Sequence, residues 1–170
     1  MYLITAYFDD KTSNILMRHI KNVANATNNN YMIDNNVPPH LTVCALEAIN
    51  VEYLVEGFDR FSSNQTSGEV FIASLGQFLP YVLYCAPVPN KYLMDMSKML
   101  SDIYENVEKV SINKFYQAGN WLPHITLAKK LELSEMQSAV AVMQNSFVPI
   151  KGRIVRLGLS KVNPHVDVKV

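Results

Sequence analysis

Two kinds of hydrophobic pattern divide the chain into short segments that favour different secondary structures. In some segments apolar and polar residues alternate, which is typical of strands because successive side chains point to opposite faces. In others apolar residues recur every three or four positions, which is typical of helices with one buried face. The alternating pattern predicts strands over residues 2–8, 40–46, 69–78, 81–88, 150–162 and 166–170, and the helical spacing predicts helices through residues 16–24, 54–61, 93–107 and 136–143.

The two halves of the chain repeat one order of elements: strand, long helix, loop, strand, short helix, strand. A chain of 170 residues is long enough for a single domain. We therefore predict one α+β domain built as a bilobal duplicated unit, with pseudo-symmetric lobes at about residues 1–80 and 81–170. Two antiparallel-rich sheets would line a central cleft, with the helices packed outside them.

Polar residues indicate where the predicted helices could begin and where the chain could turn. The candidate caps are Thr12 or Ser13 for the first helix, Asn50 for the second, Asn90 for the third, and a capping box of Ser134 and Gln137 for the fourth. Asn163 and Pro164 predict a turn between the last two strands.

Two five-residue stretches share the pattern Pro-His-aliphatic-Thr-aliphatic. They cover residues 39–43 and 123–127, so His40 and His124 are separated by about half of the chain. Because a strand has a period of two, the histidine and threonine of each stretch share one face while the aliphatic pair points into a core. The repeat predicts that two imidazoles and two hydroxyls face one shared cleft.

A pair of imidazoles across a cleft suits phosphoryl transfer. A histidine can be neutral or charged near neutral pH, so one ring can take a proton from the attacking oxygen while the other protonates the leaving oxygen. The hydroxyls of Thr42 and Thr126 could donate to non-bridging phosphate oxygens. Neither motif contains the carboxylates that divalent cations prefer as ligands, so we predict chemistry without a metal ion or another cofactor.

The paired motifs resemble those of the two-histidine (2H) phosphoesterase superfamily. Within it, residues 121–128, Trp-Leu-Pro-His-Ile-Thr-Leu-Ala, are similar to the second motif of the bacterial 2′-5′ RNA ligase and cyclic phosphodiesterase branch. The resemblance implies a bilobal fold with a central cleft, and hydrolysis of a 2′,3′-cyclic phosphate or a 2′-5′ linkage, with ligation as the reverse reaction in some members. It assigns acid–base roles to His40 and His124, and phosphate binding to Thr42 and Thr126.

Two positions depart from the pattern of that branch. An arginine often follows its second motif where this chain has Lys129, and a basic residue often precedes the strand that begins here at Tyr81. Lysine can bind phosphate as a point charge but lacks the bidentate geometry of arginine, and Tyr81 carries no positive charge. The departures favour opening of cyclic phosphates over joining of RNA.

Residues outside the two motifs supply further candidates. The rings of Trp121, Tyr116 and Phe78 could stack on a nucleobase, or they could cover the core. Lys129 lies at an odd offset from His124, so it would face the cleft only if the strand ended or bulged there.

Three more residues are expected to have structural places. Cys44 lies four positions after His40, and period two puts it on the same face as a small residue at the floor of the cleft. His19, on a predicted helix, and His165, in a predicted turn, are expected at the surface.

Composition limits the ligands and the cellular compartment. The chain has 15 basic and 15 acidic residues, whereas proteins that bind long duplexes usually have a basic excess. The two cysteines are expected to be free buried thiols. Residues 1–8 lack a basic leader, and no apolar run approaches the roughly 20 residues that span a bilayer. We therefore predict a cytoplasmic monomer that binds neither a membrane nor a long duplex.

Three functions are compatible with these residues. The first is a metal-independent phosphoesterase for 2′,3′-cyclic phosphate ends of RNA or nucleotides, or for short 2′-5′ linked oligonucleotides. Either histidine could be its base, because the two motifs are nearly symmetric; for a cyclic phosphate opened to a 2′-phosphate, our assignment is that His124 activates water and His40 protonates the 3′-oxygen. The alternatives are a 2′-5′ RNA ligase, and a non-catalytic module that binds an RNA end or a cyclic nucleotide in the same cleft. The enzyme is favoured because binding alone would not require two imidazoles, and no P-loop or dinucleotide fingerprint indicates another ligand class.

Overall fold

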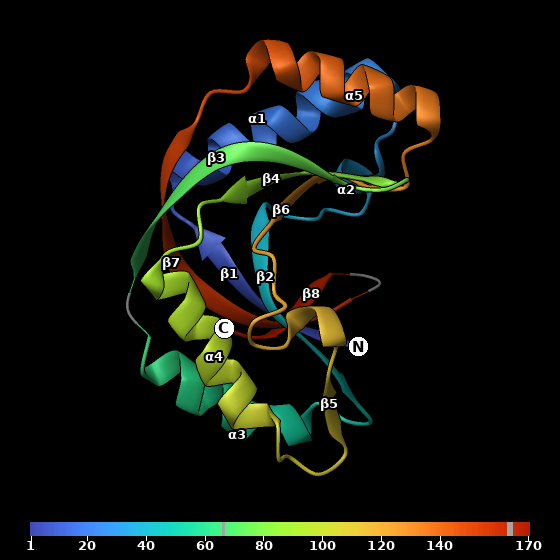
Figure 1. Ribbon diagram of the computed structural model, residues 1–170. Coiled ribbons are helices and arrows are strands. Elements are labelled where there is room, and N and C mark those ends of the chain that lie inside the picture. Colours follow the sequence, from blue (N-terminus) through green and yellow to red (C-terminus); the bar gives the residue numbers. More distant parts are fainter. Residues whose placement is uncertain (66, 163–164) are drawn as a thin grey trace.

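The computed structural model describes residues 1–65, 67–162 and 165–170 (Figure 1). The strands are β1 (Tyr2–Phe8), β2 (His40–Ala48), β3 (Gly68–Phe78), β4 (Val82–Pro87), β5 (Val110–Ile112), β6 (Ile125–Ala128), β7 (Ile150–Lys161) and β8 (Val166–Lys169). The helices are α1 (Asp10–Thr27), α2 (Tyr31–Asp34), α3 (Glu52–Ser63), α4 (Lys91–Tyr104) and α5 (Leu133–Ser146), with a 3-10 turn, η1 (Lys114–Tyr116). The strands and long helices expected from the hydrophobic pattern are confirmed, whereas the short elements α2, β5 and η1 were not predicted.

The strands form one antiparallel sheet with two parts. Its order is β5-β2-β1-β7-β3-β4-β6, and β8 pairs with β7. β7 joins the parts, because residues 154–161 pair with β1 while residues 150–154 pair with β3. The predicted α+β class with antiparallel sheets is confirmed, and the two expected sheets share a strand.

The two halves of the chain are interleaved in this fold. α1 of the first half packs on α5 of the second, and α3 packs on α4 (Figure 1). β7 of the second half lies between β1 and β3 of the first. The halves predicted from the sequence, residues 1–80 and 81–170, therefore each contribute to both parts of the sheet.

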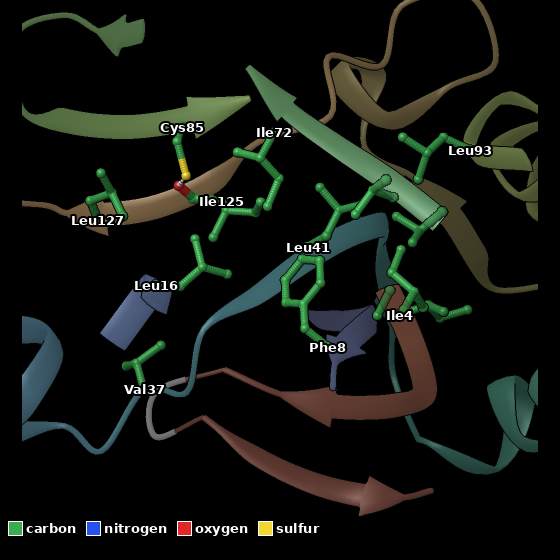
Figure 2. Close-up of a cluster of buried hydrophobic side chains, with 14 of the residues drawn as sticks. Ile4, Phe8, Leu16, Val37, Leu41, Ile72, Cys85, Leu93, Ile125 and Leu127 are labelled. Carbon is green, nitrogen blue, oxygen red and sulfur yellow. Dashed lines mark hydrogen bonds between the residues drawn. The ribbon is translucent and has the colours of Figure 1, made fainter. Parts of the chain in front are cut away.

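The aliphatic residues of the two motifs anchor their strands in the core. Figure 2 shows Leu41 of β2 with Ile125 and Leu127 of β6 in one buried cluster, together with Leu16 of α1. Each of these side chains is at most 1 % exposed. Burial of one such side chain contributes about 1.5–3 kcal/mol, so this face of each strand is strongly fixed. The histidine and threonine that alternate with these aliphatic residues therefore point the other way.

Among the described residues, no helix is long and apolar enough to cross a membrane.

The predicted N-terminal cap is confirmed for α4 and wrong for α1. Asn90 caps α4 as expected, since its side chain accepts a hydrogen bond from the N–H of Leu93 at 2.9 Å. α1 instead begins after Asp9, whose carboxylate accepts from the N–H of Thr12 at 2.8 Å. Thr12 or Ser13 is therefore not the cap, because an acidic residue one turn earlier already occupies that role.

The two remaining caps are also corrected. α5 has a capping box formed by Glu132 and Glu135 rather than by Ser134 and Gln137. α3 begins without a side-chain cap, so Asn50 does not serve as one. In both places several polar residues lie within one turn, and the sequence pattern does not rank them. The predicted turn at residues 163–164 lies outside the described residues.

Candidate active site

The two motifs border one cavity of about 350 Å³. His40 is the first residue of β2, His124 directly precedes β6, and the two strands contact each other. His40, Thr42, His124 and Thr126 all line the cavity. The structure thus brings together the four residues that the repeated pattern predicts.

Each motif strand has one extra residue directly after its threonine. Along β2 the pairing with β1 passes from Thr42 to Cys44 while β1 moves by a single residue, so Val43 is the extra residue of a bulge. β6 has the same irregularity against β4, where Leu127 is the extra residue. The repeat therefore extends from the sequence to the local backbone geometry.

The bulges change which later residues face the cavity. One extra residue reverses the faces of all positions that follow it. Ala45 and Lys129, each five residues after its motif histidine, line the cavity. Cys44, predicted at the cleft floor, instead lies in the hydrophobic core, and this expectation was wrong because the bulge was not visible in the sequence.

Backbone carbonyls two residues earlier orient both motif imidazoles. Nδ1 of His40 lies 2.7 Å from the carbonyl oxygen of Pro38, and Nδ1 of His124 lies 2.8 Å from that of Leu122. A carbonyl oxygen only accepts hydrogen bonds, so Nδ1 carries a proton in both rings. In the neutral rings Nε2 therefore has the lone pair and can accept a proton.

Burial lowers the pKa of both motif histidines. The pKa of His40 falls to about 4, mainly because burial disfavours the charged ring; the hydrogen bond to Pro38 opposes the shift, and the nearby cationic groups of His165, His124 and Lys129 add to it. Burial also lowers the pKa of His124, against its hydrogen bond to the Leu122 carbonyl. Without a bound anion, both rings are therefore neutral at pH 7.

The rings packed against the two imidazoles differ. The ring of His40 stacks on that of His165, with centroids 4.8 Å apart and planes at 29°. The ring of His124 instead lies edge-to-face with Phe78 at 4.8 Å and tilted against Tyr84 at 5.4 Å. One imidazole thus has an ionisable neighbour, and the other has aromatic neighbours.

The two threonine hydroxyls are available to a ligand. Both residues line the cavity, and Thr42 is 6 % exposed. Within the described part of the chain, neither hydroxyl has a hydrogen-bond partner. Each can therefore donate to an oxygen atom placed between the two histidines.

Lys129 provides a positive charge at the cavity, just beyond the end of β6. Its Nζ lies 4.7 Å from the centroid of the Tyr31 ring, and Nζ of Lys130 lies 4.4 Å from the same centroid. The side chain of Asn29 also donates a hydrogen bond to the Lys130 carbonyl at 3.2 Å. Asn29 and the first residue of α2, Tyr31, therefore hold the lysine pair that follows the second motif.

A second cavity, of about 400 Å³, adjoins the first and is lined mainly by aromatic rings. His124 and Tyr116 line both cavities. The aromatic residues of the second cavity are Phe78, Phe115, Tyr116 and Trp121. The three rings predicted as stacking candidates are thus gathered beside His124, and Phe115 was missed although it directly precedes Tyr116.

The aromatic candidates differ in how much of each ring a ligand can reach. Trp121 is 8 % exposed, and its Nε1–H donates to the Thr42 carbonyl at 3.0 Å. Its main contact therefore ties the loop before β6 to β2. Phe78 is 38 % exposed and Phe115 is 66 % exposed, so these two rings have more surface for a nucleobase.

Two histidines were wrongly expected at the surface. His165 is half-buried and stacks on His40. His19 is 6 % exposed and packs against Phe147, with ring centroids 5.8 Å apart. His19 could have been recognised, since it lies between Leu16 and Val23 at helical spacing on the buried face of α1. His165 could not, because a turn between the last two strands does not show that β7 pairs with β1, which brings this turn close to His40.

Both cysteines are free and buried, as predicted. Burial raises the pKa of each thiol to about 12, so neither provides a thiolate nucleophile at neutral pH. Among the residues in the described ranges, no three His, Cys, Asp or Glu side chains form a group that could hold a metal ion.

An α+β fold in which two His-x-Thr strands border one cavity defines a two-histidine phosphoesterase class of protein. The sequence profile of the 2′-5′ RNA ligase superfamily matches residues 8–165, and the chain belongs to this superfamily. Among solved structures, that of Kluyveromyces marxianus Usb1 is similar, with a TM-score of 0.48 and 12 % sequence identity over 99 % of this chain and 97 % of that chain. No curated protein matches the chain.

Proposed function

We propose that this protein is a metal-independent phosphoesterase that opens 2′,3′-cyclic phosphates on RNA ends or nucleotides, or cleaves short 2′-5′ linkages. The observation that supports this most directly is the pair of imidazoles on one cavity, each with Nδ1 held by a carbonyl and Nε2 left free. Membership of the 2′-5′ RNA ligase superfamily supports RNA or a nucleotide as the substrate.

The surroundings of the two rings favour His40 as the base and His124 as the acid. His40 has the pKa of about 4 and cationic neighbours, so it stays neutral over a wide range of pH. An anionic phosphate entering the cavity raises the pKa of both rings, and His124 lies against uncharged aromatic rings. The proton is therefore expected on His124. This assignment is the reverse of the one made from the sequence.

Opening of a cyclic phosphate then follows a balanced sequence of proton transfers. His40 Nε2 takes a proton from the attacking water as its oxygen bonds to phosphorus. His124 gives its Nε2 proton to the 3′-oxygen as the P–O3′ bond breaks, which leaves a 2′-phosphate and a 3′-hydroxyl. Proton exchange with solvent restores both rings. Each proton transfer typically contributes about 10²–10⁴ in rate.

The remaining cavity residues complete a binding site for the substrate. Thr42 and Thr126 donate to the non-bridging oxygens, and Lys129 offsets the negative charge of the phosphate. The nucleobase lies in the adjoining aromatic cavity, where Phe78 and Phe115 offer exposed rings. Stacking of a base on an aromatic ring contributes about 1–3 kcal/mol.

The test is incubation with 2′,3′-cyclic nucleotides and with 2′-5′ and 3′-5′ dinucleotides in buffer containing EDTA, with products identified by ³¹P NMR. The proposal predicts conversion of at least one cyclic phosphate or 2′-5′ substrate to a monoester at a rate that EDTA does not change. Tight binding without turnover would instead support a non-catalytic module, and joined 2′-5′ ends would support a ligase. Activity that EDTA abolishes and a divalent ion restores would refute the metal-independent mechanism.

A further inference from the structure

A third imidazole contacts the site from a segment outside both motifs. His165 directly precedes β8, and its ring lies nearly parallel to the ring of His40 at 4.8 Å between centroids. His124 stacks on no histidine ring among the described residues; its neighbours are Phe78 and Tyr84. The stack on His165 therefore distinguishes two histidines that are otherwise held alike.

A hydrogen-bonded carboxylate lies behind His165. Oδ1 of Asp167 accepts from the hydroxyl of Tyr7 at 2.5 Å and from that of Ser160 at 2.6 Å, and its Oδ2 accepts from Arg156 at 3.1 Å. Burial alone would raise the pKa of Asp167, but these hydrogen bonds outweigh it and hold that pKa below its usual range. Asp167 is therefore ionised at neutral pH and only accepts.

This arrangement determines the direction of the next hydrogen bond. The single hydroxyl proton of Tyr7 is donated to Asp167, so the Tyr7 oxygen accepts from Nε2–H of His165 at 3.0 Å. His165 is thus linked to a carboxylate through one hydroxyl group. The corresponding partner of His40 is the neutral carbonyl of Pro38.

The backbone leaves room for the pair of Tyr7 and Asp167. A Cβ atom on Gly158 of β7 would lie 2.9 Å from Oδ1 of Asp167 and 2.9 Å from a ring carbon of Tyr7. These distances are shorter than ordinary van der Waals contacts, so any larger residue would displace one partner. The glycine therefore allows β1 and β8 to bring their polar side chains together across β7.

We infer that His165 is a positioning residue that holds the His40 ring in its plane and takes protons in preference to it, which keeps His40 available as the base. The inference rests on the proposed function for its catalytic consequence. A proton that reaches the stacked pair is stabilised on His165 by Asp167, through Tyr7. The resulting charge then opposes a second proton on His40.

None of the other charged groups near the stacked pair, among the described residues, favours a proton on His165. Lys129 lies close enough to disfavour a charge on either ring of the pair, and His124 disfavours one on His40. Arg156 lies 4.0 Å from the Tyr7 ring centroid but is paired with Asp167. Asp167 is therefore the group that favours a proton on His165, and burial opposes it.

The direct test is an NMR titration of the four histidine rings, assigned by single substitutions. We expect His165 to titrate at higher pH than His40. Asp167→Asn keeps the shape but removes the charge, and Tyr7→Phe removes the linking hydroxyl. Each should lower the pKa of His165 and raise that of His40, by about one unit for Asp167→Asn, with His124 as the internal reference. The inference is overturned if His40 titrates at a higher pH than His165. It is also overturned if neither substitution changes the pKa of His165 or of His40 by more than it changes the pKa of His124.

Kinetics separate the proton-taking role from simple packing. His165→Phe keeps a stacked ring that cannot ionise, so the acidic limb of kcat/KM should move to higher pH while the plateau stays within about threefold. His165→Ala also loses the stack, and kcat should fall about tenfold with little change in KM. His19→Phe, at a buried histidine outside the site, serves as the control and should change neither the acidic limb of kcat/KM nor kcat. An unchanged acidic limb in His165→Phe would contradict the inference.

The kinetic experiment requires the proposed hydrolysis to occur, whereas the NMR titration does not. The NMR titration needs no substrate, so it tests His165 even if the cyclic phosphates are not hydrolysed. If hydrolysis occurs but the titration order is reversed, only the role of His165 fails.

Discussion

At the scale of single residues, the two motif histidines have the same hydrogen-bond constraint but different neighbours. Nδ1 of each is held by a carbonyl, whereas the ring of His40 stacks on another imidazole and the ring of His124 lies edge-to-face or tilted against aromatic rings. Identical residues in identical motifs can therefore differ in protonation state. The free energy of unfolding should also depend on these rings, because burial of a neutral histidine disfavours its charged form.

His40 should make the folded state sensitive to acid. Its pKa is about 4 in the fold, below the ordinary value of 6.5, so between these values the unfolded chain binds a proton that the folded chain does not. Stability is fully present above pH 6.5 and is lost as the pH falls toward 4, by about 2.5 kcal/mol at pH 4.5. His40→Asn, whose amide can still donate to Pro38, should lose that part of the pH dependence.

Urea unfolding of both proteins at pH 7.5 and pH 4.5 measures the effect. Comparison of the variant with the wild type removes the contribution of carboxylates, which both share. Equal losses of unfolding free energy in the two proteins would show that His40 does not titrate as its burial requires.

Lys129 and Lys130 offer a matched pair for testing phosphate binding. Both contact the Tyr31 ring, but of the two only Lys129 lines the cavity between the motif histidines. A charged hydrogen bond is worth about 1.5–3 kcal/mol, so Lys129→Ala should lower kcat/KM by about 10- to 100-fold. Added salt should lower the kcat/KM of the wild type more than that of the variant, because the wild type has the additional charge interaction. Lys130→Ala should stay within about threefold of the wild type. Equal effects of the two substitutions would indicate a general surface charge instead.

At the scale of elements, the bulges after Thr42 and Thr126 decide which later residues reach the cavity. They place Ala45 and Lys129 there and send Cys44 into the core. The sequence could not show this, because the two residues directly after each threonine are small or apolar and either face accepts them.

Helix starts give a further test at this scale. Asp9 caps α1 through the N–H of Thr12, and this hydrogen bond lowers the pKa of its carboxyl. Asp9→Ala should destabilise the protein by about 1 kcal/mol at pH 7, and the loss should become smaller as the pH falls through the lowered pKa of the Asp9 carboxyl, below which it is protonated in both states. The control is Asp10→Ala, since Asp10 is exposed in the first turn without a capping contact. Chemical denaturation measures both, and similar losses would contradict the capping role of Asp9.

Local patterns predicted most elements but not their ends. The apolar spacing along α1 and α4, and the alternation along the first residues of β7, survive in the fold because these elements have one face in the core, whereas β1 is buried on both faces. Caps failed where several polar residues compete within one turn, as at Asp9 and Glu132.

At the scale of the whole molecule, the site depends on segments far apart in the chain. The repeated motifs alone predicted that His40 and His124 share a cavity, and the fold places them there. The place of His165 could not be predicted, because it requires β8 to pair with β7 and β7 to pair with β1. Interleaving of the two halves also means that neither half contains the whole site.

The most direct measurement is turnover of a 2′,3′-cyclic nucleotide in EDTA by the wild type and by His40→Asn and His124→Asn, each shown to be folded by thermal melting. Asparagine keeps a donor near the Nδ1 position but cannot replace Nε2. Each substitution should lower kcat by about 10²–10⁴, while His19→Asn, outside the cavity, should leave kcat unchanged. Full turnover in either motif variant would contradict the account.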